Sequence, residues 1–410
     1  MYIKRHIEET IKEVAKNYPA VIVTGPRQVG KSTVLSTICG DIKDLTFDDP
    51  ELVRYAVENG RMFFQTYNPP LLLDEVQYAP ELFSYIKMLV DKDKKAGQFY
   101  MTGSQSFHLM KNVNESLAGR VGVVELNGLS MREILRRDTR TPFLPADNFI
   151  QQIKTETIKL NNNELWEIIR KGSMPAIYDK SFEGDALKQF YANYIRTYME
   201  RDVRTLSQIG DERAFYQFLS LVASNTAQML NFTQMASNIG KDVKTVQAWI
   251  SILRASGLVY FLEPYSSNIN KRIIKTPKIY FMDTGLASYL TGWHTAEQLQ
   301  TGAFAGAIFE TFVVTELIKG YNNKGLDTRL KFSYYRDKDG KEIDFIIEND
   351  GTLYPIEIKK TGNPNNADAK SFSVLSNEAT KKLGNGTIIY GGEDVLFLKD
   401  GLTAVPVKLI

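Results

Sequence analysis

The chain has 410 residues, a length that is too great for one small core and predicts two to four domains. Hydrophobic residues make up 43% and charged residues 24%, which is the ordinary composition of a globular protein and excludes a fibrous or disordered chain. The formal net charge is only +2, so nothing at this level marks the whole chain as a nucleic-acid binder, and any basic surface must be local.

Three features of the sequence bear on its location. Cys39 is the only cysteine, so no disulfide forms within the chain, as is usual in a reducing compartment. The first residues are charged and lack the apolar segment of a secretory signal. The most apolar helical stretch, 303–317, is too short to span a bilayer and is interrupted by Glu310, Thr311 and Thr315. We therefore expect a cytoplasmic protein with no membrane partner.

Residues 1–150 predict an α/β domain. Short apolar stretches alternate there with helical ones, and this alternation favours a parallel sheet with helices on both faces. The expected strands are Ala20–Val23, Leu45–Phe47, Leu71–Leu73, Gln98–Met101 and Val121–Leu126.

A glycine-rich loop follows the first expected strand. Gly25–Ser32 fits the pattern G-x-x-x-x-G-K-[ST] at every fixed position. Its glycines let backbone N–H groups turn inward around phosphate oxygens, and the following helix adds its partial positive N-terminus. Lys31 can reach the β- and γ-phosphates, and the Ser32 hydroxyl can bind Mg²⁺. We predict that ATP contacts Gly25, Arg27, Gln28, Val29, Gly30, Lys31, Ser32 and Thr33.

A second element supports the same chemistry. The apolar strand Leu71–Leu73 ends in the two acids Asp74 and Glu75. Asp74 at the carboxyl end of a strand can hold the hydration shell of Mg²⁺. Glu75 can orient the attacking water and accept its proton. Together with the phosphate loop, these acids predict an ATPase that requires Mg²⁺.

Two further candidates are less specific. The strand at Tyr100 ends in small polar residues, of which Ser104 and Gln105 could contact the γ-phosphate or the water, although an ordinary polar turn would look the same. Arg120 is a candidate arginine finger for its own or a neighbouring subunit, which would imply a homo-oligomer. A surface arginine is the alternative.

The middle of the chain predicts a helical connector at 151–210 and a winged helix-turn-helix at 211–298. A short helix and a turn at 232–242 end at Asp242, which can cap the next helix, and a strand at 258–262 follows. The second helix places four apolar residues on one face: Val246, Trp249, Ile250 and Leu253.

The open face of this second helix is a candidate DNA surface. Lys244, Thr245 and Gln247 lie on it, and a basic cluster nearby could contact phosphates. That cluster comprises Lys271, Arg272, Lys275 and Lys278. Winged helices also bind proteins, so contact with DNA and contact with a protein partner both stay open.

Residues 299–410 predict an α+β domain with a second candidate metal site. Strand periodicity places Glu357 and Lys359 on one face, Asp344 lies on the adjacent strand, and Glu310 lies in an apolar helix that could pack against them. Asp344 and Glu357 could hold Mg²⁺ for phosphodiester hydrolysis, with Glu310 and Lys359 nearby. A solvated strand face with alternating charges is the alternative.

The whole chain resembles a family of bacterial and archaeal AAA-type ATPases whose C-terminal half is classed as a domain of unknown function. The resemblance rests on motifs in the same order along the chain: Gly25–Thr33, Leu73–Gln77, Thr102–Ser106, Leu117–Arg120, Tyr198–Val203, Tyr280–Gly285 and the region from Glu310 to Lys359. It implies a multidomain α/β protein with a P-loop sheet, a winged helix and a domain similar to PD-(D/E)xK nucleases.

The resemblance also implies roles for four residues. The nuclease motif maps onto Glu310, Asp344, Glu357 and Lys359, although Ile343 stands where that motif has proline.

Two hypotheses follow from the whole sequence. In the first, ATP drives an action on nucleic acid; in the second, the chain is a nucleotide-controlled switch or interaction module with an inactive nuclease-like domain.

Overall fold

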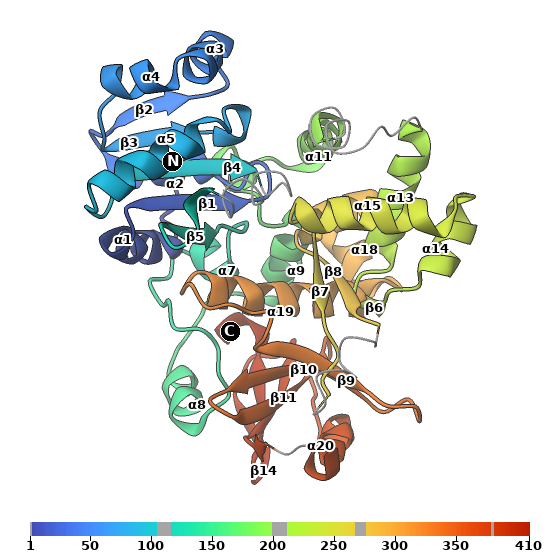
Figure 1. Cartoon of the computed structure of the whole chain (residues 1–410). Helices are drawn as coiled ribbons and strands as arrows, with labels where there is room; N and C mark the ends of the chain where they lie inside the picture. Colours follow the sequence, from blue (N-terminus) through green and yellow to red (C-terminus); the bar gives the residue numbers. More distant parts are fainter. Residues whose placement is uncertain (1, 105–115, 199–210, 267–275, 379–380) are drawn as a thin grey trace.

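The structure is a computed structural model that describes residues 2–104, 116–198, 211–266, 276–378 and 381–410 (Figure 1). The first part is built on a five-stranded parallel sheet with the strand order β2-β3-β4-β1-β5. Its strands are β1 (Ala20–Gly25), β2 (Lys43–Thr46), β3 (Leu71–Asp74), β4 (Phe99–Ser104) and β5 (Val121–Glu125). The predicted α/β class with a parallel sheet is confirmed.

Helices cover both faces of this sheet, which explains why its strands read as continuous apolar runs. Val21 and Val23 of β1 pack in a cluster with α1 (Ile7–Asn17) and α2 (Lys31–Cys39). The alternating residues Ala20 and Ile22 pack in a second cluster on the opposite face. That cluster is covered by α3 (Pro50–Glu58), α4 (Gly60–Thr66) and α5 (Leu82–Lys92).

Helices dominate the middle of the chain, as predicted. They are α7 (Met131–Ile134), α8 (Asp147–Lys154), α9 (Asn162–Lys171), α10 (Pro175–Asp179), α11 (Gly184–Tyr198) and α13 (Glu212–Ser224). Two further helices, α14 (Phe232–Ile239) and α15 (Val243–Ala255), are joined by a turn in which Gly240 has φ +63°. Asp242 caps α15, because its side chain accepts a hydrogen bond from the Thr245 N–H at 2.9 Å.

A small antiparallel sheet accompanies these two helices. Its strands β6 (Gln228–Met229), β7 (Val259–Leu262) and β8 (Lys278–Phe281) have the order β6-β8-β7. The predicted apolar face of α15 is buried, since every one of its four residues is at most 6% exposed: Val246, Trp249, Ile250 and Leu253.

The last part combines three helices with a mixed sheet. The helices α17 (Thr284–Leu290), α18 (Ala296–Thr301) and α19 (Ala305–Asn322) precede a sheet with the order β14-β15-β13-β11-β10-β9, and β12 pairs with β11. Its strands are β9 (Phe332–Arg336), β10 (Glu342–Asn349), β11 (Thr352–Lys359), β12 (Lys382–Leu383), β13 (Gly386–Tyr390), β14 (Leu396–Lys399) and β15 (Leu402–Pro406). Helix α20 (Ser373–Glu378) packs against β10 and β11 through Leu375. The predicted hairpin is confirmed, with Asp350 and Gly351 in its turn at positive φ.

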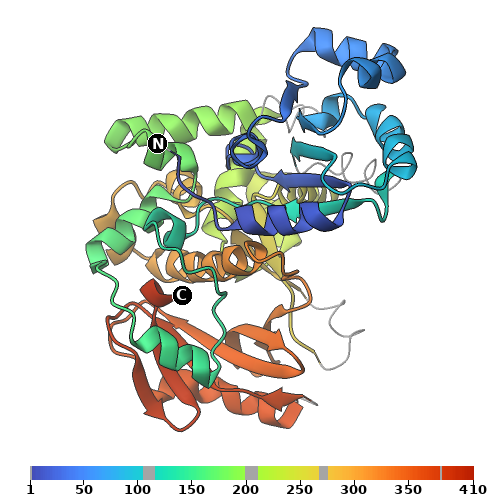
Figure 2. The same ribbon diagram turned by 90° about the vertical axis from the view of Figure 1, so that its left-hand side faces the viewer.

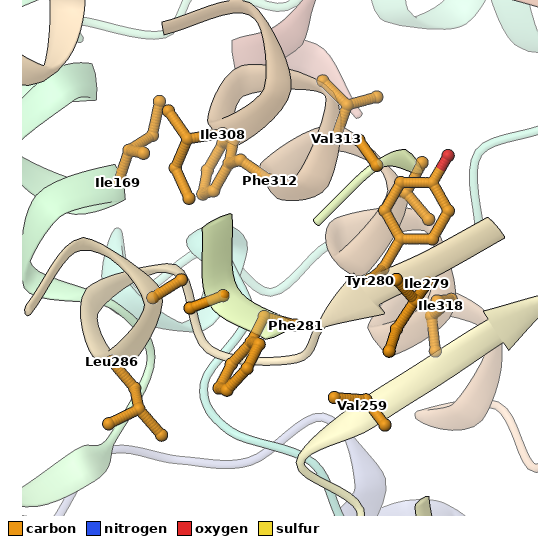
Figure 3. Packing of buried hydrophobic residues seen from close by; sticks show 14 of the residues in the cluster. Ile169, Val259, Ile279, Tyr280, Phe281, Leu286, Ile308, Phe312, Val313 and Ile318 are labelled. Carbon is orange, nitrogen blue, oxygen red and sulfur yellow. The ribbon is translucent and has the colours of Figure 1, made fainter. Parts of the chain in front are cut away.

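One apolar core extends from Met131 to Ile410 and joins the middle of the chain to its last part. Helix α19 runs through the centre of the molecule, above the C-terminal sheet, in both views (Figures 1 and 2). Its residues Ile308, Phe312 and Val313 pack with residues of α9, α17 and the β7–β8 pair (Figure 3). This core crosses the predicted boundary at residue 298, and the predicted domain limits stay a prediction.

Helix α7 connects the N-terminal sheet to this core by polar contacts. The Met131 N–H donates to Glu316 Oε2 at 2.7 Å, and Lys319 Nζ donates to the Leu129 carbonyl at 3.1 Å. Arg132 Nε donates to the Ile410 carbonyl at 2.9 Å.

Among the residues that the structure describes, no helix is long and apolar enough to cross a membrane.

Candidate functional site

The glycine-rich loop between β1 and α2 has the backbone of a phosphate cradle. Gly25, Gln28 and Gly30 have φ values of +149°, +62° and +90°, which turn successive N–H groups toward one side. A Cβ atom on Gly25 would lie 2.0 Å from the Leu126 carbonyl oxygen, so only glycine fits there. No side chain caps the N-terminus of α2, whose N–H groups are therefore available to an anion.

The predicted loop residues differ in what they can offer to a nucleotide. Lys31 is buried, and its Nζ donates to the carbonyl oxygens of Gly25 at 3.1 Å and Pro26 at 2.9 Å, which places the ammonium group at the loop. The Val29 side chain lies in the apolar core below, so this residue can offer only its backbone. Arg27 is half-buried, and the side chains of Gln28 and Thr33 are exposed.

Three oxygen-bearing side chains meet beside the loop. Asp74, at the carboxyl end of β3, accepts hydrogen bonds through Oδ1 from Ser32 Oγ at 2.7 Å and from Thr102 Oγ1. Mg²⁺ prefers such oxygen ligands and usually keeps water and phosphate oxygens as well. The residues therefore fit a magnesium-bound triphosphate. Sequence reasoning missed Thr102, although its place at the end of a neighbouring parallel strand was a usable signal.

Glu75 follows directly and has a left-handed backbone, with φ +56° and ψ +46°. Its N–H donates to Thr102 Oγ1 at 3.0 Å, which fixes the backbone, and its Oε2 accepts a hydrogen bond from Gln77 Nε2. Gln77 is thus a second residue to which sequence analysis assigned no role. It sets the direction of the Glu75 carboxylate.

The remaining nucleotide-site candidates fall in different places. Ser104 ends β4 directly beside Gly25 in the strand register, whereas Gln105 lies outside the described residues. Arg120 precedes β5, and its carbonyl accepts from the N–H of Ala20 at the start of β1. Arg120 therefore lies at the opposite end of β1 from the loop. The rise per residue of a strand puts the two ends of β1 about 17 Å apart.

The prediction that Arg120 contacts phosphate in its own chain is therefore wrong. Its guanidinium instead forms two hydrogen bonds with Asp91, at 2.5 and 3.1 Å. A contact with the nucleotide of a neighbouring copy stays a prediction.

The predicted C-terminal site residues do come together. Lys359 Nζ lies 2.7 Å from Glu357 Oε1 on β11, and Asp344 Oδ2 on β10 accepts from the Ile358 N–H at 2.9 Å. Glu357 Oε2 is buried and has no hydrogen-bond partner within the described ranges. Glu310 of α19 completes this group, which we call the acid cluster.

Lys278 of β8 also belongs to the acid cluster, which corrects its predicted role. The sequence suggested a phosphate contact, yet its side chain is only 4% exposed and its Nζ lies 3.1 Å from Glu310 Oε1 and 2.5 Å from Glu342 Oε1. Lys271, Arg272 and Lys275 lie outside the described residues. In the sequence, the position of Lys278 at the start of an otherwise apolar strand was the available signal that its side chain is buried.

Burial perturbs the carboxyl groups of the acid cluster. It raises the pKa of Glu310 to about 7 against the opposing charge of Lys278, and it raises the pKa of Glu357 to about 8, helped by the charge of Asp344. Within the described part of the chain, no three or more His, Cys, Asp or Glu side chains form a group that could hold a metal ion. The predicted metal ligands Asp344 and Glu357 thus lie in a mixed cluster with two lysines.

The predicted DNA surface borders a groove. Lys244 and Gln247 of α15 are exposed, whereas Thr245 is half-buried and its Oγ1 donates to Asp242 Oδ2 at 2.6 Å. A groove of about 760 Å³ separates α14 and α15 from the β9–β10 hairpin. Amides, hydroxyls and charged groups line much of it, including those of Gln234, Gln247, Thr276, Lys278 and Arg336.

Comparison with known proteins identifies three segments. Residues 17–135 match a family model described as an AAA domain. Residues 162–297 and 305–410 match two models, each described as a domain of unknown function, DUF8612 and DUF4143. The uncharacterized proteins Mb2031c of Mycobacterium bovis and Rv2008c of Mycobacterium tuberculosis are each 28% identical to the chain over 408 residues, which is 99% of this chain and 84% of theirs.

Two solved structures show a weaker likeness. A Walker-type ATPase of Pyrococcus abyssi has a TM-score of 0.44 at 13% identity and covers 70% of this chain and 96% of its own. AMPPCP-bound DnaA from Aquifex aeolicus has a TM-score of 0.26 at 13% identity and covers 60% of this chain and 85% of its own. Residues 17–135 are similar to AAA domains, and this segment carries the parallel sheet and the glycine-rich loop.

Proposed function

We propose that the chain is an ATPase that requires Mg²⁺. The observation that carries this proposal is the contact of Ser32 and Thr102 with Asp74 directly beside a glycine-lined loop that ends at Lys31. Lys31 would bind the β- and γ-phosphates, and Ser32 and Asp74 would hold the magnesium ion, which neutralises phosphate charge when bound. The similarity of residues 17–135 to AAA domains supports the same function.

Glu75 takes the role of the general base in this proposal. Its carboxylate, positioned by Gln77, would orient a water molecule against the terminal phosphorus. The water oxygen bonds to phosphorus, the bond to the β–γ bridging oxygen breaks, and Glu75 accepts the proton of the water. The products are ADP and inorganic phosphate.

Nucleotide binding by a Lys31→Ala variant tests the site. We expect the dissociation constant for ATP to rise at least about tenfold, because one charge-assisted phosphate contact contributes roughly 1.5–3 kcal/mol. Isothermal titration measures it, with Lys12→Ala on the exposed face of α1 as the matched control. Equal affinity in the wild type and in Lys31→Ala would refute the assignment of the loop.

We infer that the middle of the chain is a winged helix that contacts nucleic acid. The capped α15, the accompanying antiparallel sheet and the polar groove support this inference. The exposed Lys244 could meet a phosphate, and the Gln247 amide could contact a base. ATP turnover would then drive an action on nucleic acid by one copy or by a homo-oligomer.

A titration with duplex DNA at two salt concentrations tests this inference. We expect binding to weaken as salt rises, and Lys244→Gln to reduce the slope of log affinity against log salt by about 1. Lys87→Gln, on the exposed side of α5, is the control and should leave the slope unchanged. An affinity that does not change with salt would contradict the inference and favour a protein partner.

The second candidate function is a nucleotide-controlled switch. A continuous set of contacts favours it: Pro175 lies beside Gly30 of the phosphate loop, and the Ser173 N–H and hydroxyl both donate to Asp283 Oδ2 at 2.7 Å. Asp283 follows β8, whose Lys278 lies in the acid cluster. A nucleotide in the loop could thereby bias the nuclease-like C-terminal part, whether or not that part cuts DNA.

A further inference from the structure

The acid cluster already contains a cation supplied by another part of the chain. Lys278 comes from the small antiparallel sheet, and the carboxylates around it come from α19 and the C-terminal sheet. Its Nζ lies 2.5 Å from Glu342, 3.1 Å from Glu310 and 4.0 Å from Asp344. One ammonium group thus contacts acids from two separate elements, as a divalent ion would.

The surroundings hold this ammonium group in place. Lys278 pairs with Met229 on one side and Leu262 on the other, so its backbone sits in the middle of a three-stranded sheet. Its Nζ also lies 5.6 Å from the centre of the Tyr334 ring. Tyr280, two residues along β8, donates its hydroxyl to Glu310 Oε1 at 2.7 Å and so keeps that acid beside the lysine.

Other cations of the chain balance most of the remaining charge. Arg336 pairs with Glu342 at 2.9 Å, and Lys359 pairs with Glu357 at 2.7 Å. The four carboxylates of Glu310, Glu342, Asp344 and Glu357 therefore face three cationic side chains. A metal ion that entered would leave Lys278 buried without its partners, and an unpaired buried charge is strongly unfavourable.

We propose that Lys278 Nζ takes the place of the divalent cation in the acid cluster, so that the C-terminal part of this chain binds no catalytic metal in this arrangement. The lysine instead acts as an internal ionic lock between β8 and the α19–β10 surface. This proposal does not depend on the ATPase, because it involves none of the nucleotide-site residues. It predicts that removal of the lysine charge creates a metal site.

Mn²⁺ binding tests the proposal, measured by isothermal titration on nucleotide-free full-length protein. The variants are Asp344→Asn, Lys278→Met and the double variant with both changes. We expect that the Asp344→Asn change abolishes no Mn²⁺ binding of the wild type, because the wild type has no Mn²⁺ site in the acid cluster. The Lys278→Met variant should gain one such site, with an affinity at least about tenfold above any binding by the wild type, and the double variant should lose it again.

Three results would overturn the proposal. The first is a wild-type Mn²⁺ site that disappears in Asp344→Asn. The second is a folded Lys278→Met variant, judged by circular dichroism, that gains no site. The third is DNA nicking by the wild type with Mg²⁺ or Mn²⁺ that both Asp344→Ala and Lys359→Ala abolish. If Lys278→Met does not fold, the melting temperature of the wild type is measured with and without Mn²⁺. An unchanged melting temperature supports the lock. A rise with Mn²⁺ that is absent from the Asp344→Asn variant overturns it.

Discussion

Replacement of Arg5 by alanine is expected to lower the free energy of unfolding by about 3–5 kcal/mol, because it leaves a buried carboxylate without its cation. Arg5 is 2% exposed, and its Nε lies 3.1 Å from Glu133 Oε1, whose side chain is fully buried. The same guanidinium donates to the carbonyl oxygens of Val29 at 2.9 Å and of Asn127 at 2.7 Å. One side chain therefore holds together the N-terminal segment, the phosphate loop and the segment that follows β5.

The state of Glu133 explains why the loss should be so large. Burial by itself would raise its pKa, but the charge of Arg5 and the N–H groups of Ser130 and His6 outweigh burial, so the pKa lies below its usual value. In the wild type the carboxylate thus stays ionised at neutral pH. Without Arg5 it is buried with N–H donors alone, and either keeping its charge or taking up a proton lowers stability.

Urea unfolding followed by circular dichroism measures this effect. Lys4→Ala is the matched control, because Lys4 is exposed and its contact with Asp138 at 3.8 Å lies at the surface. The pair Arg5→Met with Glu133→Gln should recover part of the loss, since no charge is then buried alone. If Arg5→Ala unfolded at the same urea concentration as Lys4→Ala, the claim that this pair stabilises the loop would fail.

Substitution of Glu75 by glutamine should reduce the ATP turnover number about 10²–10⁴-fold, while the affinity for ATP stays close to that of the wild type. The amide keeps the size of the side chain and its proximity to Gln77, but it cannot accept the proton of the attacking water. Single-turnover phosphate release measures the chemical step, and a binding titration of the same preparation measures affinity.

Two comparisons make the Glu75 result specific. Glu81→Gln, at the exposed start of α5, should turn over like the wild type. Gln77→Ala should show an intermediate loss of turnover at unchanged affinity, because it frees the Glu75 carboxylate without removing it. Unchanged hydrolysis by Glu75→Gln would mean that another residue activates the water.

The features that could be predicted from the sequence are those with local causes. The phosphate loop needs particular residue types at fixed spacing, the Asp242 cap needs only the next three residues, and the hairpin at Asp350–Gly351 needs only its turn. In a parallel sheet the carboxyl ends of strands share one edge. The same rule explains why Asp74, at the carboxyl end of β3, lies beside Ser32 at the end of the loop that follows β1.

The same rule, applied more fully, could have found Thr102 and rejected Arg120 as a contact within its own chain. Thr102 lies near the end of its strand, whereas Arg120 precedes its strand and therefore lies at the far edge. The sequence offered no comparable signal for Arg5, whose partner Glu133 lies 128 residues away. For Lys278, its place at the start of an otherwise apolar strand was a signal of burial, but this signal did not identify its partners, which come from two distant elements.

The core shared by residues 131–410 has a consequence for the descent of this protein. Helix α19 buries apolar residues toward both the middle helices and the C-terminal sheet, so neither partner could cover that helix alone. Gene fusion and recombination that cut within this stretch would yield two fragments with exposed apolar faces. The two segments of unknown function should therefore be inherited as one unit, and their sequences should change together.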